Sequence, residues 1–194
     1  MHTEVVSGIN SFIREQTAGH GEATVTILQF DTVIESVVEN CNIRNVPTFN
    51  TTDHFVPRNQ TALLDGIGAT IEKMSAQISR SGDIRAQEAA SRAACCVITT
   101  DGLENASSKY SRQQIFTLIN QKKLEGWTFI FMGANQDAIQ AGAGFGISAG
   151  HCLTYSPTGA GYQSAFDSCS KKVAEQRVCG FATPFSPSER ASAL

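Results

Sequence analysis

The feature that most constrains the fold is a regular alternation of helical and strand patterns after residue 60. A stripe of apolar residues at steps of three and four predicts one buried face of a helix over 62–80. The stripe consists of Leu64, Ile67, Ile71, Met74 and Ile78. The apolar run at 94–100 then predicts a buried strand. Alternation of this kind is typical of α/β proteins with a parallel sheet.

The same alternation continues toward the C-terminus. Further helices are expected at 111–126, 136–143 and 159–176, and further strands at 127–133 and 151–155. The first of these helices begins with a capping box, since Gln114 lies three residues after Ser111. The pattern predicts a doubly wound, Rossmann-like α/β fold, in which a mostly parallel sheet has helices on both faces.

The first 60 residues follow a different order. An amphipathic helix is expected over 3–17, followed by strands at 23–30 and 33–38. The turn between these strands, at Asp31 and Thr32, predicts an antiparallel hairpin at the edge of the sheet. Residues 41–60 are expected to form a loop.

The chain shows no linker that would divide it. We expect one domain over 1–177, with a polar connection of some helical propensity at 81–92 and a disordered tail at 178–194.

Composition excludes several classes of protein. Hydrophobic residues make up 41% of the chain and charged residues 17%, which suits a packed core rather than a disordered chain. The net charge is -3 with no block of Lys or Arg, so no nucleic-acid partner is expected. No apolar run approaches the roughly 20 residues of a membrane span, and the N-terminus lacks a secretory signal pattern. A cytoplasmic protein without a membrane partner is expected.

The six cysteines agree with a cytoplasmic location. No Cys-x-x-Cys pattern and no zinc-like spacing of Cys and His occur in the sequence. We expect reduced thiols that pack as small apolar side chains.

Two residues are candidates for a metal site. Asp101 opens an Asp-Gly turn directly after the strand 94–100, and Thr61 precedes the helix over 62–80. In open α/β sheets, ligands bind at the carboxyl ends of strands, and both side chains supply the hard oxygen donors that Mg²⁺ prefers. The alternative is purely structural: Asp101 starts a turn, and Thr61 caps a helix.

Other motifs give weaker signals. The Gly144-x-Gly146-x-x-Ala149 pattern neither follows a predicted strand nor opens a predicted helix, so it is expected to be a flexible turn. The Gly-x-Ser-x-Gly pattern at 146–150 lies between a predicted helix and a predicted strand, which is not the strand-to-helix turn of a nucleophile elbow, so no nucleophilic catalyst is expected. A metal-assisted hydrolase that uses Asp101 is the competing interpretation to a binding protein.

Three segments in this order and spacing resemble the von Willebrand factor type A domain: "ATVTILQFD", "NQTALLDGIG" and "VITTDGLENAS". A fourth segment, "GWTFIFMGANQDA", is similar to the following strand and helix in a bacterial group of these proteins. The resemblance covers roughly residues 1 to 175. It implies a doubly wound fold with a metal-ion-dependent adhesion site on the upper edge of the sheet. It also implies a protein-binding role rather than an enzymatic one.

In the family, three loops hold Mg²⁺, which binds an acidic group of a partner protein. Thr61 matches the threonine of the second loop, and Asp101 matches the aspartate of the third. The Asp-x-Ser-x-Ser motif of the first loop does not occur in this sequence. The resemblance therefore implies that the first central strand is missing and that the site is compromised, with Mg²⁺ affinity expected to be millimolar or weaker.

The missing strand suggests an N-terminally truncated protein, because Met1 stands where the family has a methionine after the motif. A non-functional fragment is the other alternative.

Overall fold

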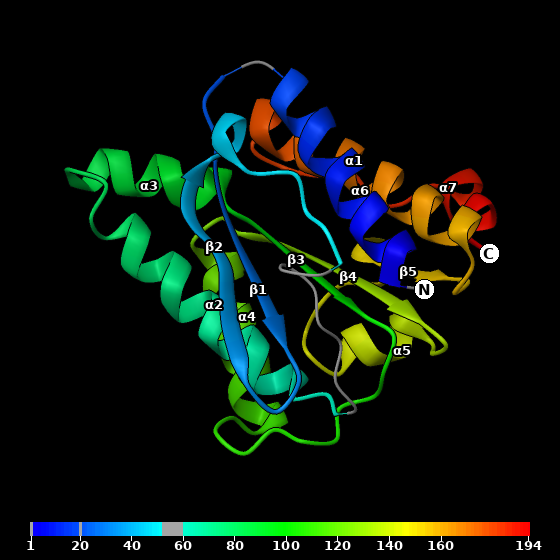
Figure 1. Cartoon of the computed structure of the whole chain (residues 1–194). Helices are drawn as coiled ribbons and strands as arrows, with labels where there is room; N and C mark the ends of the chain where they lie inside the picture. The colour runs from blue at the N-terminus through cyan, green and yellow to red at the C-terminus, as the bar shows by residue number, and fades with distance from the viewer. Residues whose placement is uncertain (1, 20, 52–59) are drawn as a thin grey trace.

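The structure is a computed structural model, and it describes residues 2–19, 21–51 and 60–194 (Figure 1). Met1 and residues 52–59 of the predicted loop lie outside the described residues. The rest of that loop contains a short 3-10 helix, η1, at Ile43–Asn45.

The predicted hairpin is confirmed. Strand β1 (Thr24–Phe30) pairs antiparallel with β2 (Ile34–Asn42), and β2 extends further than the pattern indicated. Asp31 is buried in the turn, where its carboxylate accepts a hydrogen bond of 2.6 Å from the backbone N–H of Val33. An aspartate that bonds the backbone two residues on stabilises a turn of this kind.

A second sheet contains the three later strands in the order β3-β4-β5, all parallel. They are β3 (Cys95–Thr100), β4 (Thr128–Ala134) and β5 (Cys152–Tyr155). Strand β4 lies between the other two, and all but its first residue are buried. Parallel strands buried on both faces carry near-continuous apolar runs, as the "TFIFMGA" of β4 does.

Helices cover both faces, which confirms the α/β doubly wound architecture (Figure 1). They are α1 (His2–Ala18), α2 (Leu63–Ile78), α3 (Ile84–Ala93), α4 (Arg112–Leu124), α5 (Ala138–Ala143), α6 (Gly159–Cys179) and α7 (Pro187–Ala193), with a 3-10 turn η2 (Ala149–His151). Helices α2 and α4 pack with Ile98 and Phe131 on one face, and α1, α6 and α7 surround Ile130 and Leu153 on the other. None of the described helices has the length and apolar content needed to cross a membrane.

The structure differs from the sequence-based expectation at the C-terminal tail. Helix α6 runs to Cys179, and α7 follows where disorder was expected. Ser186 and Glu189 form a capping box at the start of α7, and Ala193 at its end is fully buried. The guanidinium of Arg190 donates a hydrogen bond of 2.7 Å to the backbone oxygen of Cys152. The tail is therefore ordered because it packs along β5.

A second difference concerns the segment 81–92. It was expected to be a polar connection, and most of it forms α3, whose first turn is capped by the carboxylate of Asp83. No residue of α3 is buried. The helix therefore depends on its cap and its propensity more than on packing.

The two sheets do not pair with each other among the described residues: β1 bonds only to β2, and β3 bonds only to β4. A cavity of about 950 Å³ separates them and is lined by every residue of β1 and of β3. Helices α1 and α2 line it from the two faces. Helix α2 approaches β1 closely at Gly66, where a Cβ would lie 2.9 Å from the ring of Phe30.

Candidate functional site

Thr61 and Asp101 lie together at the carboxyl ends of β1 and β3. These strands run in the same direction on either side of the cavity (Figure 1). Backbone hydrogen bonds join the segments that follow them: Ala62 N–H donates to the oxygen of Asp31 at 2.7 Å, and Asn105 N–H donates to that of Thr61 at 3.1 Å. A Cβ at Gly102 would lie only 2.8 Å from Oγ1 of Thr61. The structure thus brings both predicted residues to one edge, as the family resemblance implied.

The Asp101-Gly102 turn is shaped by its neighbours. The hydroxyl of Thr100 donates to the backbone oxygen of Gly102 at 3.0 Å and accepts from its N–H at 3.3 Å. The amide of Gln136, which follows β4, donates to the same oxygen at 3.3 Å. These bonds fix the turn and leave the side chain of Asp101 exposed at the edge.

Thr61 does not cap α2, so the structural alternative for this residue is wrong. Ala62 occupies the N-cap position and makes no side-chain cap bond. The carboxylate of Glu104 caps the start of α2 instead, because it accepts a hydrogen bond of 3.0 Å from the N–H of Leu64. Asn105 accepts from the N–H of Thr61 at 2.9 Å. The loop after β3 therefore holds Thr61 in place and leaves its hydroxyl facing Gly102.

A second carboxylate also joins α2 to the loop after β3, but here the helix supplies the carboxylate and the loop supplies the N–H donors. Asp65, in the first turn of α2, is buried and accepts hydrogen bonds from three consecutive backbone N–H groups after β3. The donors are Ser108 at 2.9 Å, Lys109 at 3.0 Å and Tyr110 at 2.9 Å. Asp65 and Glu104 together join α2 to the loop that carries Asp101.

Both carboxyl groups are stabilised in their charged form. For Asp65, burial opposes ionisation most strongly, but the three backbone N–H bonds together outweigh it and lower the pKa. The pKa of Glu104 is also lowered: burial again opposes, and the bonds from Ser107, Leu64 and Ala106 prevail. A negative charge at the first turn of α2 also suits the helix dipole. These residues act structurally and were missed in the sequence because their partners lie about 40 residues away.

The donors present do not form a complete metal site. Thr61 contributes one neutral oxygen and Asp101 one carboxylate, whereas Mg²⁺ requires octahedral oxygen coordination. Among the described residues, no group of three or more His, Cys, Asp or Glu side chains could hold a metal ion. The pair can therefore supply part of a coordination shell.

The buried cysteines are unsuited to nucleophilic chemistry. Burial raises the pKa of Cys96 and Cys169 to about 12, and it raises that of Cys152 to about 11. A protonated thiol is a poor nucleophile and a poor metal ligand. All six cysteines are free thiols, and these three pack in the core.

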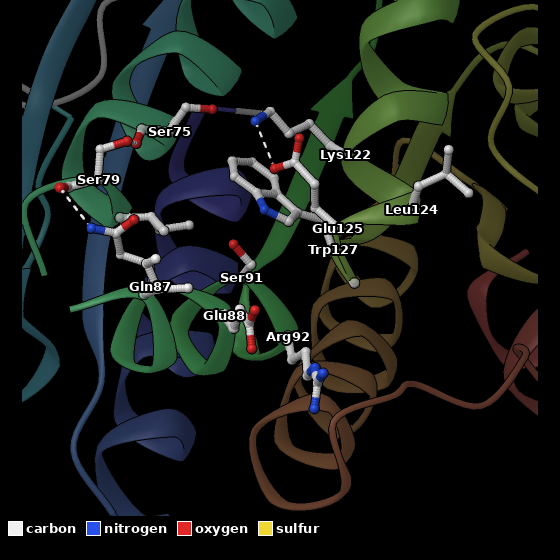
Figure 2. A pocket seen from close by; sticks show the side chains of 13 residues that line it. Ser75, Ser79, Gln87, Glu88, Ser91, Arg92, Lys122, Leu124, Glu125 and Trp127 are labelled. Carbon is white, nitrogen blue, oxygen red and sulfur yellow. Dashed lines mark hydrogen bonds and ion pairs between the residues drawn. The ribbon is translucent and has the colours of Figure 1, made fainter. Parts of the chain in front are cut away.

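A smaller hollow of about 460 Å³ lies far from Thr61 and Asp101, between α2, α3 and the end of α4 (Figure 2). Its lining carries both charge signs. Lys122 forms an ion pair of 2.8 Å with Glu125 and lies over the ring of Trp127, and Gln87 donates to the backbone oxygen of Ser79 at 3.1 Å. Two other lining atoms, the hydroxyl oxygen of Ser75 and the indole nitrogen of Trp127, are buried without a hydrogen-bond partner among the described residues.

Comparison with solved structures shows a protein of similar fold. The structure is similar to that of proximal thread matrix protein 1 from the mussel byssus, solved with zinc in its metal-ion-dependent adhesion site, with a TM-score of 0.59 and 17% sequence identity. The match covers 89% of this chain and 43% of that protein, so the chain spans less than half of its length. No protein-family model matches the sequence, and no curated protein matches it. The likeness shows a von Willebrand factor A-like fold.

Proposed function

We propose that the chain is a protein-binding module of the von Willebrand factor A type, and that Thr61 and Asp101 form its binding edge. The proposal is supported by the close approach of the Thr61 hydroxyl to Gly102, the neighbour of the exposed Asp101, at the carboxyl ends of two strands. This is where ligands bind in open α/β sheets. The structural neighbour carries a metal at its adhesion site, which makes a divalent metal the natural ligand to test.

The partner in this proposal is a protein that presents an acidic group. A divalent cation between that group and Asp101 offsets the repulsion between two carboxylates. With Thr61 and Asp101 as the ligands supplied by the described part of the chain, the cation binds weakly until further oxygen ligands are supplied. The module therefore binds rather than catalyses, and its six free thiols suit a reducing, cytoplasmic compartment.

The test is metal titration by calorimetry with Mg²⁺ and with Zn²⁺. The 194-residue chain should bind Mg²⁺ only in the millimolar range or more weakly. A chain that carries an added N-terminal strand ending in Asp-x-Ser-x-Ser should bind at least about 100-fold more tightly, because it gains several oxygen ligands. It should then retain a short glutamate peptide only when the metal is present.

Two variants of the strand-bearing chain complete the test. Asp101→Ala should abolish the gain in metal affinity, whereas Asp83→Asn, which keeps a good cap on the distant α3, should leave the gain intact. Micromolar Mg²⁺ binding by the unmodified chain would contradict the proposal. Unchanged metal affinity in Asp101→Ala would do so as well.

A further inference from the structure

The hollow in Figure 2 has one fixed wall, the indole ring of Trp127. This side chain is only 3% exposed, and its ring stacks on that of Phe129 with the ring centroids 6.1 Å apart. The ammonium of Lys122 lies 5.3 Å from the centroid of the indole. The ring is therefore held in one orientation by its neighbours. Trp127 precedes β4, so the hollow lies at the amino ends of the parallel strands, away from the edge that carries Asp101.

Two buried polar atoms of the lining have no hydrogen-bond partner among the described residues. They are Nε1 of Trp127 and Oγ of Ser75. An indole N–H can only donate, so it needs an acceptor, and a buried donor without one costs free energy. In Figure 2 the indole nitrogen lies on the side of the ring toward Ser91 of α3, whereas Ser75 belongs to α2 on another side of the hollow. The hollow thus offers a fixed donor and, apart from it, a hydroxyl.

Helix α3 forms a second wall with one of its faces. The lining residues of α3 follow one another at steps of three and one, which places them on the same side of the helix: Ile84, Gln87, Glu88, Ser91 and Arg92. The rim carries exposed apolar side chains, since Ile84 is 73% exposed and Leu124, at the end of α4, is 91% exposed. Open apolar surface beside a buried, unsatisfied donor is typical of a site for a small ligand.

The charges of the lining cancel. Lys122 and Glu125 form their ion pair at 2.8 Å, and α3 contributes one carboxylate and one guanidinium, those of Glu88 and Arg92. A charged ligand would lose hydration without meeting a wall of the opposite sign. The lining therefore favours a ligand without net charge.

We propose that this hollow binds a small uncharged molecule that combines an apolar ring with a carbonyl oxygen, and that the oxygen accepts a hydrogen bond from the indole N–H of Trp127. The volume of about 460 Å³ lies in the range of about 300–1,000 Å³ for ligand pockets. No strand residue lines the hollow in the described part of the chain, so an extended peptide would find no strand edge to pair with. The proposal is independent of the metal and of the acidic partner group.

The test uses NMR titration of the 194-residue chain in EDTA. Trp127 is the one tryptophan of the sequence, so its indole N–H gives a single side-chain signal of this type. The test ligands are acetophenone and α-methylstyrene, which have nearly the same shape but differ in a carbonyl oxygen and a methylene group. Acetophenone should move the indole signal downfield, as a new hydrogen bond does, with a dissociation constant of about 1–10 mM for a molecule of this size. At equal concentration, α-methylstyrene should not move it downfield.

Three results with the unmodified chain would overturn the proposal. An indole signal that acetophenone does not move would mean that the hollow holds water only. An equal downfield shift with α-methylstyrene would mean a general apolar hollow without use of the indole donor. Tighter binding of benzoate or of protonated benzylamine than of acetophenone would contradict the preference for an uncharged ligand.

Trp127→Phe tests the donor itself, because it keeps an aromatic ring and removes the N–H. The backbone signal of Gly126, which also lines the hollow, reports binding in this variant. Acetophenone should bind about fivefold more weakly, as expected for the loss of one neutral hydrogen bond. Unchanged affinity would overturn the proposal.

A matched pair of substitutions on α3 locates the site. Ser91 lines the hollow, whereas Ala89 is exposed on the same helix and is not part of the lining. Ser91→Phe should fill the hollow and abolish acetophenone binding, and Ala89→Phe should leave it unchanged. Equal effects of the two substitutions would place the binding elsewhere and overturn the proposal. If Trp127→Phe fails to fold, this exposed pair and the unmodified chain still decide.

Discussion

Strands β1 and β4 have the same length and very different surroundings. Both have seven residues and are mainly apolar, "TVTILQF" in β1 and "TFIFMGA" in β4. Strand β4 has a neighbour on each edge, and six of its residues are buried. Strand β1 has one neighbour, and none of its residues is buried. The burial of a strand therefore depends on its neighbours in the sheet as well as on its own residues.

The difference also divides the molecule by packing. The three-stranded sheet has a closed core on both faces. The hairpin is held to it by α1, by α2 and by the loop bonds at Thr61, with the cavity in between. Regions with open apolar contacts and unpaired strand edges have low local stability. The proposed binding edge and the cavity both lie where the hairpin meets the three-stranded sheet.

The largest expected effect comes from equal truncations in the two strands. Ile130 of β4 is fully buried, and Ile27 of β1 is half-buried beside the cavity. Ile130→Ala should lower the free energy of unfolding by about 3–4 kcal/mol, since it leaves a cavity in a packed core. Ile27→Ala should lower it by about 1–2 kcal/mol, because less surface is re-exposed.

Urea denaturation with a common m-value would measure both losses. Equal losses in the two variants would mean that β1 is as tightly packed as β4, and the comparison between the strands would fail.

A smaller effect is expected at the carboxylates that join the two halves. Asp65→Asn keeps the shape of the side chain and removes the charge that receives three N–H bonds. The loss should be about 1.5–3 kcal/mol, the range for hydrogen bonds to charged groups. Asp83→Asn, at the exposed cap of α3, should change stability very little, because asparagine caps as well as aspartate.

The same carboxylates predict how stability depends on pH. The pKa values of Asp65 and Glu104 are lowered in the folded chain. Their contribution is therefore fully present above the unfolded values, near pH 4, and is lost as the pH falls through the lower folded values. The free energy of unfolding should therefore begin to fall as the pH drops below about 5, and it should continue to fall until the pH has passed the lowered folded pKa values. Urea denaturation at these pH values should show a smaller fall for Asp65→Asn, and an equal fall would exclude the proposed role of Asp65.

The sequence predicted the parts of the fold that depend on local pattern. The stripe of α2 and the hairpin turn at Asp31 are encoded within a few residues, and both are confirmed. The ordered tail was missed because the burial of Ala193 arises from packing beside β5. The roles of Asp65 and Glu104 were missed for the same reason, since their partners lie far along the chain. Local patterns carry no information on such distant pairs.

The smallest effect on stability is expected at the proposed binding edge. Asp101 is exposed, and Asp101→Ala should change the free energy of unfolding by less than about 0.5 kcal/mol, as for other surface substitutions. Gly102→Ala should lower the free energy of unfolding by more than this, because the new methyl group would lie only 2.8 Å from the Thr61 hydroxyl. Thermal unfolding of both variants, with Leu103→Ala at the exposed neighbouring position as a control, tests this order. A large loss in Asp101→Ala would assign this carboxylate to holding the fold together. If Asp101→Ala leaves the stability unchanged but removes metal binding from the strand-bearing chain, the role of Asp101 is binding.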